Sequence, residues 1–150
     1  GGVTHIIHCG NIYSTDIGLD VLSEFKVYYN LRPDQEDRKD KPANWSLISR
    51  DDPVEEIDGY KFCVLLAMGP ELFNKSESQM HEISMQILSK YPEIYFLLCG
   101  STWNSFLEEG EGLMFLNPGD ASRNGNFAII ELPRYEITFG RIQSDPLPPL

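Results

Sequence analysis

Several apolar runs of this sequence end in a glycine-containing loop, and the residues at those ends are the first candidates for chemistry. The loops are Gly10-Asn11, Gly69-Pro70, Gly100-Ser101 and Asn117-Pro118-Gly119. In open α/β sheets, ligands collect beyond the carboxyl ends of the strands, where loops of this kind meet. The pattern therefore predicts a candidate site at one rim of a sheet.

The histidines and one serine are the residues most able to act as bases, nucleophiles or metal ligands. His5 and His8 lie three apart in a β-rich run, so we expect them on opposite faces of a strand, where they cannot bind one metal ion. His81 lies in an expected helix and is interpreted as a solvated surface residue. Ser101 follows a glycine, but the Gly-x-Ser-x-Gly elbow that exposes a hydrolase nucleophile is missing.

Four aspartates are conceivable metal ligands, and one tryptophan lies near the same loops. Asp16 and Asp20 form an i, i+4 pair that we expect to face water, and Asp120 is expected to bond to the backbone of its own turn. Asp34 lies in a polar segment. Trp103 could either plug the rim or anchor a protein partner, and both interpretations stay open.

The three cysteines are far apart and lie in or at the end of apolar runs. Cys9, Cys63 and Cys99 form no Cys-x-x-Cys pair for zinc, and an odd number cannot pair completely. We expect buried, reduced thiols that act as small apolar side chains. Their state indicates a reducing compartment, which favours a cytoplasmic protein.

The bulk composition excludes several classes of protein. The formal net charge is −11, from 23 acidic and 12 basic residues, so nucleic acid and anionic membrane surfaces are repelled. No apolar run approaches the roughly 20 residues of a membrane-spanning helix, and the start of the chain lacks the basic region of a signal peptide. The charge is interpreted as a source of solubility, with an acidic face for a basic partner as the alternative.

The elements that must position these residues begin with a βαβ unit. We expect a strand at residues 3–9, a helix at 15–25 and a second, parallel strand at 26–29. The segment 30–53 is predicted to be a long polar loop. Three apolar residues inside it indicate that part of the segment packs back on the body: Trp45, Leu47 and Ile48.

The rest of the chain alternates strands, turns and one helix. Strands at 54–57 and 60–66 flank Asp58-Gly59, a strong hairpin signal. An amphipathic helix follows at 77–90, and the continuously apolar run 94–99 predicts a buried central strand. The last predicted elements are a strand at 113–116, an antiparallel pair at 127–132 and 135–139, and a proline-rich tail at 144–150.

Taken in order, the loop motifs resemble those of the calcineurin-like metallophosphoesterases, in particular their small single-domain branch. That family presents Asp-x-His, Gly-Asp, Gly-Asn-His-Asp, His-Gly and Gly-His-x-His at successive strand ends, then Asn-Pro-Gly-Ser. The counterparts here are Gly10-Asn11 for Gly-Asp, Met68-Gly69 for His-Gly, Gly100-Ser101-Thr102-Trp103 for Gly-His-x-His, and Asn117-Pro118-Gly119-Asp120 for the turn. The resemblance implies one α/β domain over residues 1–150, a layered sandwich with mixed β-sheets.

The departures from the family pattern fall on the metal ligands. In the family, these ligands hold two metal ions that activate water and bind the phosphate. Asn11 replaces the bridging carboxylate, and Met68 replaces a histidine. Neither Ser101 nor Trp103, which replace two further histidines, is a good ligand for a divalent metal. The Gly-Asn-His-Asp motif is not recovered around Tyr29-Asn30, and the leading Asp-x-His strand is either truncated or was never present.

The resemblance therefore implies a pseudoenzyme without a metal or other cofactor. The vestigial site positions are Gly10, Asn11, Met68, Gly69, Gly100, Ser101, Trp103 and Asn117. The Gly-Asn at residues 10–11 also resembles the phosphoesterase-like subunit of the retromer complex, which is a scaffold for protein partners in endosomal sorting. We expect a non-catalytic scaffold that binds a protein partner, in the cytoplasm and peripherally on endosomal membranes. The alternative is a metal-dependent phosphoesterase or phosphodiesterase that binds Mn²⁺ or Zn²⁺ through atypical ligands.

Overall fold

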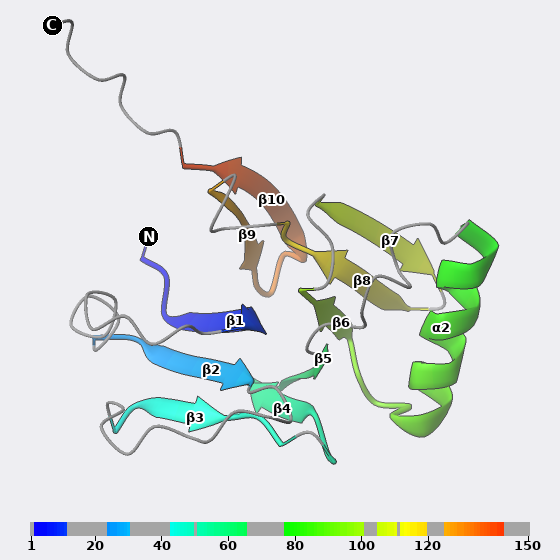
Figure 1. Cartoon of the computed structure of the whole chain (residues 1–150), viewed down its shortest axis with the longest axis horizontal. Coiled ribbons are helices and arrows are strands. Elements are labelled where there is room, and N and C mark those ends of the chain that lie inside the picture. The colour runs from blue at the N-terminus through cyan, green and yellow to red at the C-terminus, as the bar shows by residue number, and fades with distance from the viewer. Residues whose placement is uncertain are drawn as a thin grey trace, which may run out of the picture.

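Two facing β-sheets, a separate hairpin and one helix make up the described part of the chain (Figure 1). The structure is a computed structural model that describes residues 2–11, 24–30, 43–49, 51–65, 77–100, 105–110, 112–119 and 125–142. The predicted helix at 15–25 lies mostly outside these ranges, and its last two residues form a turn. Within these ranges, no helix is long and apolar enough to span a membrane.

The first sheet contains three parallel strands in the order β1-β2-β3. They are β1 (His5–Asn11), β2 (Lys26–Asn30) and β3 (Trp45–Leu47). β1 and β2 confirm the predicted parallel pair. The segment 30–53, predicted as a long polar loop, contains the short strand β3, which pairs with Val27, Tyr28 and Tyr29. Part of the segment therefore packs on the body of the protein, as its apolar residues indicated. Burial of Trp45 and Ile48 against this sheet outweighs the polar composition around them.

The second sheet contains five strands in the order β4-β5-β6-β8-β7. They are β4 (Val54–Ile57), β5 (Tyr60–Leu65), β6 (Phe96–Cys99), β7 (Phe106–Gly110) and β8 (Leu113–Asn117). β5, β6 and β8 are parallel, and the edge strands β4 and β7 are antiparallel to their neighbours. Every residue of β6 is buried, as the apolar run predicted, because both faces of this sheet are covered.

The β4–β5 turn confirms the predicted hairpin and shows its geometry. Asp58 has a φ of 52° and Gly59 a φ of 85°. A two-residue turn with positive φ at both positions matches the right-handed twist of the strands that it joins. The second hairpin, β9 (Asn126–Glu131) with β10 (Glu136–Arg141), is also antiparallel as predicted.

Three apolar clusters are buried in the described part of the chain, and two of them join its layers. The core between the two sheets includes Tyr28, Ile48, Val64, Phe96 and Leu116, and the inner face of the β9–β10 hairpin packs on it. The core on the other face of the five-stranded sheet is covered by α2 (Glu77–Lys90). The helix confirms the predicted 77–90 segment. These layers give an α/β sandwich with mixed sheets, as the sequence predicts.

Candidate functional site

The carboxyl ends of five parallel strands point toward one rim of the molecule. β1 and β2 end there in one sheet, with Asn11 and Asn30 as register partners. β5, β6 and β8 end there in the other sheet, where Leu98 pairs with Leu116 so that Gly100 and Asn117 follow on neighbouring strands. β1 also contacts β6 across the layers. The fold therefore brings the ends of the predicted loops to a common rim.

Asn30 is a site residue that sequence reasoning missed. Its side chain is 2 % exposed, and its Nδ2 donates a hydrogen bond of 3.4 Å to the carbonyl oxygen of Val64. Because Asn30 ends β2 and Val64 lies near the end of β5, this bond joins the two sheets below the rim. The available signal was an amide directly after the apolar run 27–29, where the family motif could not be recovered.

Asn117 is the vestigial position that the structure describes best. It is the last residue of β8 and is fully buried. Its Oδ1 accepts a hydrogen bond of 2.8 Å from the backbone N–H of Gly119, which has a φ of 93°. Across the same turn, the exposed Ser105 hydroxyl donates to the carbonyl oxygen of Pro118 at 2.9 Å. The Asn-Pro-Gly motif is therefore a fixed turn that closes the end of β8.

The other predicted site residues are described only in part. Gly10 and Asn11 form the end of β1, but the Asn11 side chain is not among the described atoms. Gly100 directly follows β6 and is half-buried. The remaining vestigial positions and the candidate aspartates lie outside the described residues, and they are Met68, Gly69, Ser101, Trp103, Asp16, Asp20, Asp34 and Asp120.

The described rim residues do not fit a centre of two divalent cations. Such a centre needs carboxylates or imidazoles, whereas Asn30 and Asn117 are neutral amides and Gly100 has no side chain. Both amides also hydrogen bond to backbone groups. Across the described ranges, no three His, Cys, Asp or Glu residues are grouped so that they could hold a metal ion.

The cysteine thiols at and behind this rim are buried, and their burial makes them poorly reactive. All three cysteines are free and buried. Burial, together with a smaller effect of the nearby Cys99, raises the pKa of Cys9 to about 12. Burial also raises the pKa of Cys63 to about 12, with Lys90 lowering it and Asp52 raising it. The thiolate, which is the nucleophilic form, is therefore scarce at neutral pH.

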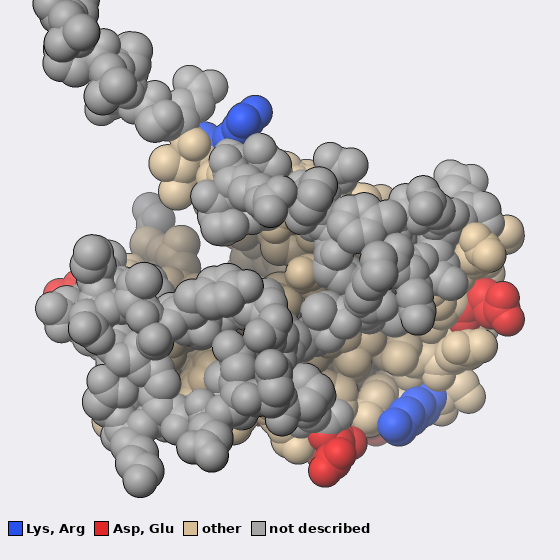
Figure 2. Space-filling view, in the orientation of Figure 1, with Lys and Arg blue, Asp and Glu red and all other residues tan. Residues whose placement is uncertain are grey.

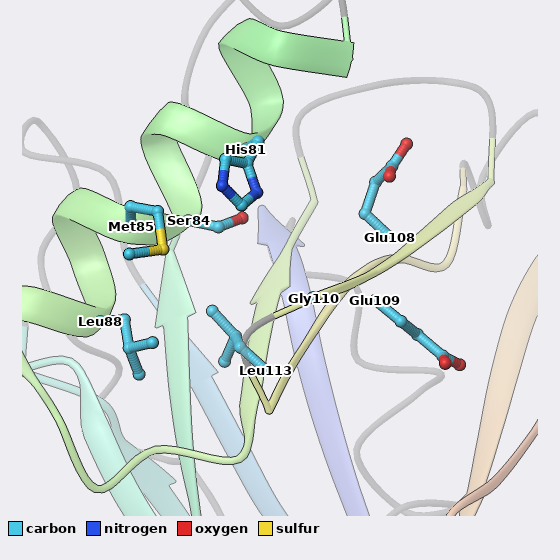
Figure 3. Close-up of a pocket in the computed structure, with 8 residues that line it drawn as sticks. All are labelled: His81, Ser84, Met85, Leu88, Glu108, Glu109, Gly110 and Leu113. Carbon is cyan, nitrogen blue, oxygen red and sulfur yellow. The ribbon is translucent and has the colours of Figure 1, made fainter.

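A small cavity lies far from the rim, between α2 and the β7–β8 hairpin (Figure 3). Its volume of about 30 Å³ has room for about two water molecules. His81 lies beside Gly110, with its Nδ1 3.9 Å from where a Cβ of that glycine would stand. The Glu109 carboxylate points away from the helix (Figure 3). His81 is exposed, as the sequence predicts, and this cavity is too small for a substrate.

The layered sandwich is the fold of small phosphoesterases. A novel archaeal phosphodiesterase superposes with a TM-score of 0.62 at 17 % identity, over 93 % of this chain and 84 % of that one. Vacuolar protein sorting 29 (Vps29) from Cryptosporidium parvum gives 0.56 at 15 % identity, over 95 % and 83 %. Wild-type Vps29 from Entamoeba histolytica, in a complex with Zn²⁺, gives 0.50 at 15 % identity, over 91 % and 96 %. No protein-family model and no curated protein matches the sequence.

The chain therefore has the small calcineurin-like metallophosphoesterase fold. Within that fold, both an archaeal phosphodiesterase and Vps29 are similar to it. At these identities the likeness defines the fold and leaves the activity to be inferred from the site.

Proposed function

We propose that this chain is a non-catalytic protein-interaction scaffold, a vesicle-trafficking subunit of the retromer type on a degenerate phosphoesterase fold. The observation that carries the proposal is an exposed apolar strip on the outer face of the β9–β10 hairpin. Phe127 is 37 % exposed, Ile129 43 % and Ile142 70 %. These three residues are called the hairpin strip. Clustered apolar side chains on a monomer surface are typical of protein-binding sites.

Strand pairing places the hairpin strip on one face. Phe127 is the register partner of Gly140 and Ile129 the partner of Thr138, so each pair shares the outer face. Ile142 joins them because its N–H bonds to the carbonyl oxygen of Gly125, one pair further along. The alternate residues Ile130 and Ile137 pack on the core between the sheets. The side chains of the hairpin strip therefore take no part in the packing of this core.

Gly140 gives the strip a flat aromatic surface. A Cβ at this position would lie 2.3 Å from the Phe127 ring, so the ring covers the glycine backbone closely. An aromatic ring held flat and half-exposed loses little freedom when a partner binds, which is why aromatic residues dominate interface energetics. The hairpin thus presents a pre-organised contact for an apolar partner side chain.

The rim and the surface charge support binding over hydrolysis. Asn30 and Asn117 are neutral and bonded to the backbone, so the described rim offers nothing that would deprotonate water. On the face shown in Figure 2, the described Lys, Arg, Asp and Glu residues lie singly and form no basic patch. With a net charge of −11, a protein is favoured as the partner over nucleic acid. A trafficking role implies a cytoplasmic protein on endosomal surfaces.

Affinity capture from a cytosolic and vesicle extract of the source cells tests this proposal. The bait is the full chain, compared with Phe127→Ser and Ile129→Ser in the strip and with Met85→Ser as the control. Met85 is 40 % exposed on α2, outside the strip. A protein retained by the wild type and the Met85→Ser variant but lost from both strip variants supports the scaffold. Identical captures by all four baits would contradict it.

A metal-dependent phosphodiesterase is the second candidate, because the archaeal phosphodiesterase shares the fold over most of both chains. Under this alternative, atypical ligands would bind Mn²⁺ or Zn²⁺ at the rim. The assay is hydrolysis of bis(p-nitrophenyl) phosphate with each metal. Turnover that is lost in an Asn11→Ala variant would favour this candidate, and turnover at the rate of buffer alone would remove it.

A further inference from the structure

Three tyrosines from separate elements pack together at the amino ends of β5 and β6. The ring centroid of Tyr60 lies 5.5 Å from those of Tyr95 and Tyr135, and the centroids of Tyr95 and Tyr135 lie 6.3 Å apart. The plane of the Tyr60 ring is inclined by 72° to that of Tyr95 and by 83° to that of Tyr135. These three residues, called the tyrosine cluster, therefore form an open corner of aromatic rings and not a flat stack.

The tyrosine cluster ends a column of stacked rings that begins in the core. Phe62 stacks on Phe96 with centroids 4.7 Å apart, and Phe96 stacks on Tyr135 with centroids 5.9 Å apart. Tyr135 is nevertheless 37 % exposed, so its exposed surface lies away from Phe96. Tyr95 is 43 % exposed. The core thus holds the rings in place and leaves aromatic surface free for a ligand, at a small cost in entropy when the ligand binds.

The charges around the tyrosine cluster favour a cationic ligand. The face of an aromatic ring is electrically negative and attracts cations. Within two residues of the three tyrosines along the chain lie three acidic and two basic residues, which are Asp58, Glu93, Glu136, Lys61 and Arg134. Both basic residues are in ion pairs, Lys61 with Glu93 and Arg134 with Glu131. The surroundings therefore share the negative sign of the whole chain, whose net charge is −11.

The spacing of the rings suits a single ammonium group. A cation is attracted when it lies within about 6 Å of a ring centroid. Because the three centroids are only 5.5–6.3 Å from one another, one cation above them can meet this limit for all three rings. Within the described ranges, lysine side chains lie over the rings of Tyr28 and Tyr91 and not over the tyrosine cluster.

A methylated ammonium fits this corner better than the bare ammonium of lysine. The bare group is strongly hydrated, so that moving it from water onto apolar ring faces costs free energy. Methyl groups weaken this hydration and add apolar contact while the positive charge stays. Aromatic corners of this kind are the usual means by which proteins recognise such ammonium groups.

A groove beside the tyrosine cluster indicates how the ammonium group is presented. The groove has a volume of about 530 Å³, and Tyr95, Lys61, Pro92 and Glu93 are among its walls. An open groove that shares a ring with an aromatic site suits an extended peptide better than a compact small molecule. We propose that the tyrosine cluster binds a methylated lysine side chain of a partner protein, whose flanking residues lie in the groove.

This site is separate from the hairpin strip of the proposed function. Tyr135 lies at the turn between β9 and β10, whereas Phe127 and Ile142 lie toward the other end of the hairpin. The two surfaces can therefore be tested independently, with variants that do not overlap.

Proton NMR titration of the full chain with the tripeptide Ala-trimethyllysine-Ala tests the proposal. We expect the N-methyl signal to move upfield and to saturate, because protons above an aromatic face are shielded, with a Kd of about 1 mM or tighter. The tripeptide with unmethylated lysine, and a neutral isostere with carbon in place of the ammonium nitrogen, should each bind about tenfold more weakly. A neutral isostere that binds as tightly as the cation would overturn the proposal, and so would the lack of a saturable shift.

Variants of Tyr95 locate the binding site. Tyr95→Leu, which keeps an apolar side chain but removes the ring, should weaken binding of the tripeptide about tenfold, whereas Tyr95→Phe should bind like the wild type. Met85→Ala on α2, 40 % exposed in the wild type, is the control for loss of an exposed apolar side chain and should change nothing. Unchanged binding by Tyr95→Leu would contradict the assignment.

Cosedimentation with phosphatidylcholine vesicles separates a peptide from a lipid headgroup, which carries the same quaternary ammonium chemistry. We expect the chain to stay in the supernatant, because the groove is bounded by Glu93 and Lys61 and offers no apolar insert for a bilayer. Sedimentation with the vesicles that is lost in Tyr95→Leu would assign the tyrosine cluster to a lipid and overturn the protein partner.

Discussion

Two buried amides, Asn30 and Asn117, stand at strand ends that face the rim. Asn30 donates to Val64 O, and Asn117 accepts from the Gly119 N–H. An amide in these places satisfies a backbone group without the desolvation penalty that a buried carboxylate carries. At the residue scale, therefore, these two described amides serve the structure of the rim.

Asn117→Ala is expected to destabilise the chain by about 1–3 kcal/mol, because it leaves a buried turn without the acceptor for Gly119 N–H. The measurement is urea unfolding followed by circular dichroism. Ser105→Ala, which removes a hydrogen bond in the same turn from an exposed hydroxyl, is the control and should cost less than about 0.5 kcal/mol. An unchanged midpoint for Asn117→Ala would show that the turn does not depend on this amide.

The cysteines predict both slow chemistry and a loss of stability at alkaline pH. Ellman's reagent at pH about 8 should modify none of Cys9, Cys63 and Cys99 in the native chain and all of them in urea, because the native thiols are buried. The folded pKa values of Cys9 and Cys63 rise from 9.0 to about 12. A raised folded pKa gives stability that is complete below the unfolded value and is lost as pH rises toward the folded value. We therefore expect the urea midpoint to fall above pH 9, and rapid native labelling would contradict this account.

At the scale of elements, short turns and buried strands fix the layers. The β4–β5 turn depends on Gly59, whose φ of 85° is easy only for glycine. Gly59→Val should lower the free energy of unfolding by about 1–2 kcal/mol. Thermal unfolding of this variant is compared with Gly2→Val, since a Cβ at Gly2 meets nothing within 4 Å. Equal melting temperatures for the two variants would mean that the turn does not set the hairpin.

Local signals explain which elements the sequence could predict. The apolar run 94–99 and Asp58-Gly59 carry their structure in neighbouring residues, so β6 and the β4–β5 hairpin were predictable. β3 was missed because it forms by pairing with residues far away in the sequence, and β7 was missed because its composition conceals it. β3 forms where Trp45 meets Val27, and β7 is an edge strand whose Glu108 and Glu109 conceal its β character.

The sequence predicted where the candidate site lies in the fold, but it predicted only some of the residues that form it. Glycines after apolar runs marked the rim, and Asn117 proved to be a buried turn residue at the end of β8. Asn30 was not identified, because its role depends on Val64, which is far away in sequence and adjacent only in the folded chain. Pairings of this kind carry no local pattern.

For the whole molecule, a phosphoesterase-type sandwich carries a neutral rim, an exposed apolar hairpin strip and a net charge of −11. The proposed role in binding rests on these features. A scaffold must keep its layers rigid while its contact surface stays exposed, and two cores with an outward-facing hairpin strip meet both requirements.

Calorimetric titration of the full chain with Mn²⁺ tests the central claim most directly, with Entamoeba histolytica Vps29 and Zn²⁺ as the positive control. A degenerate rim predicts no heat beyond dilution, because Asn11 replaces the family's bridging carboxylate, and Ser101 and Trp103 replace two of its histidines. Micromolar or tighter binding of two Mn²⁺ ions per chain would contradict the scaffold account and favour the phosphodiesterase.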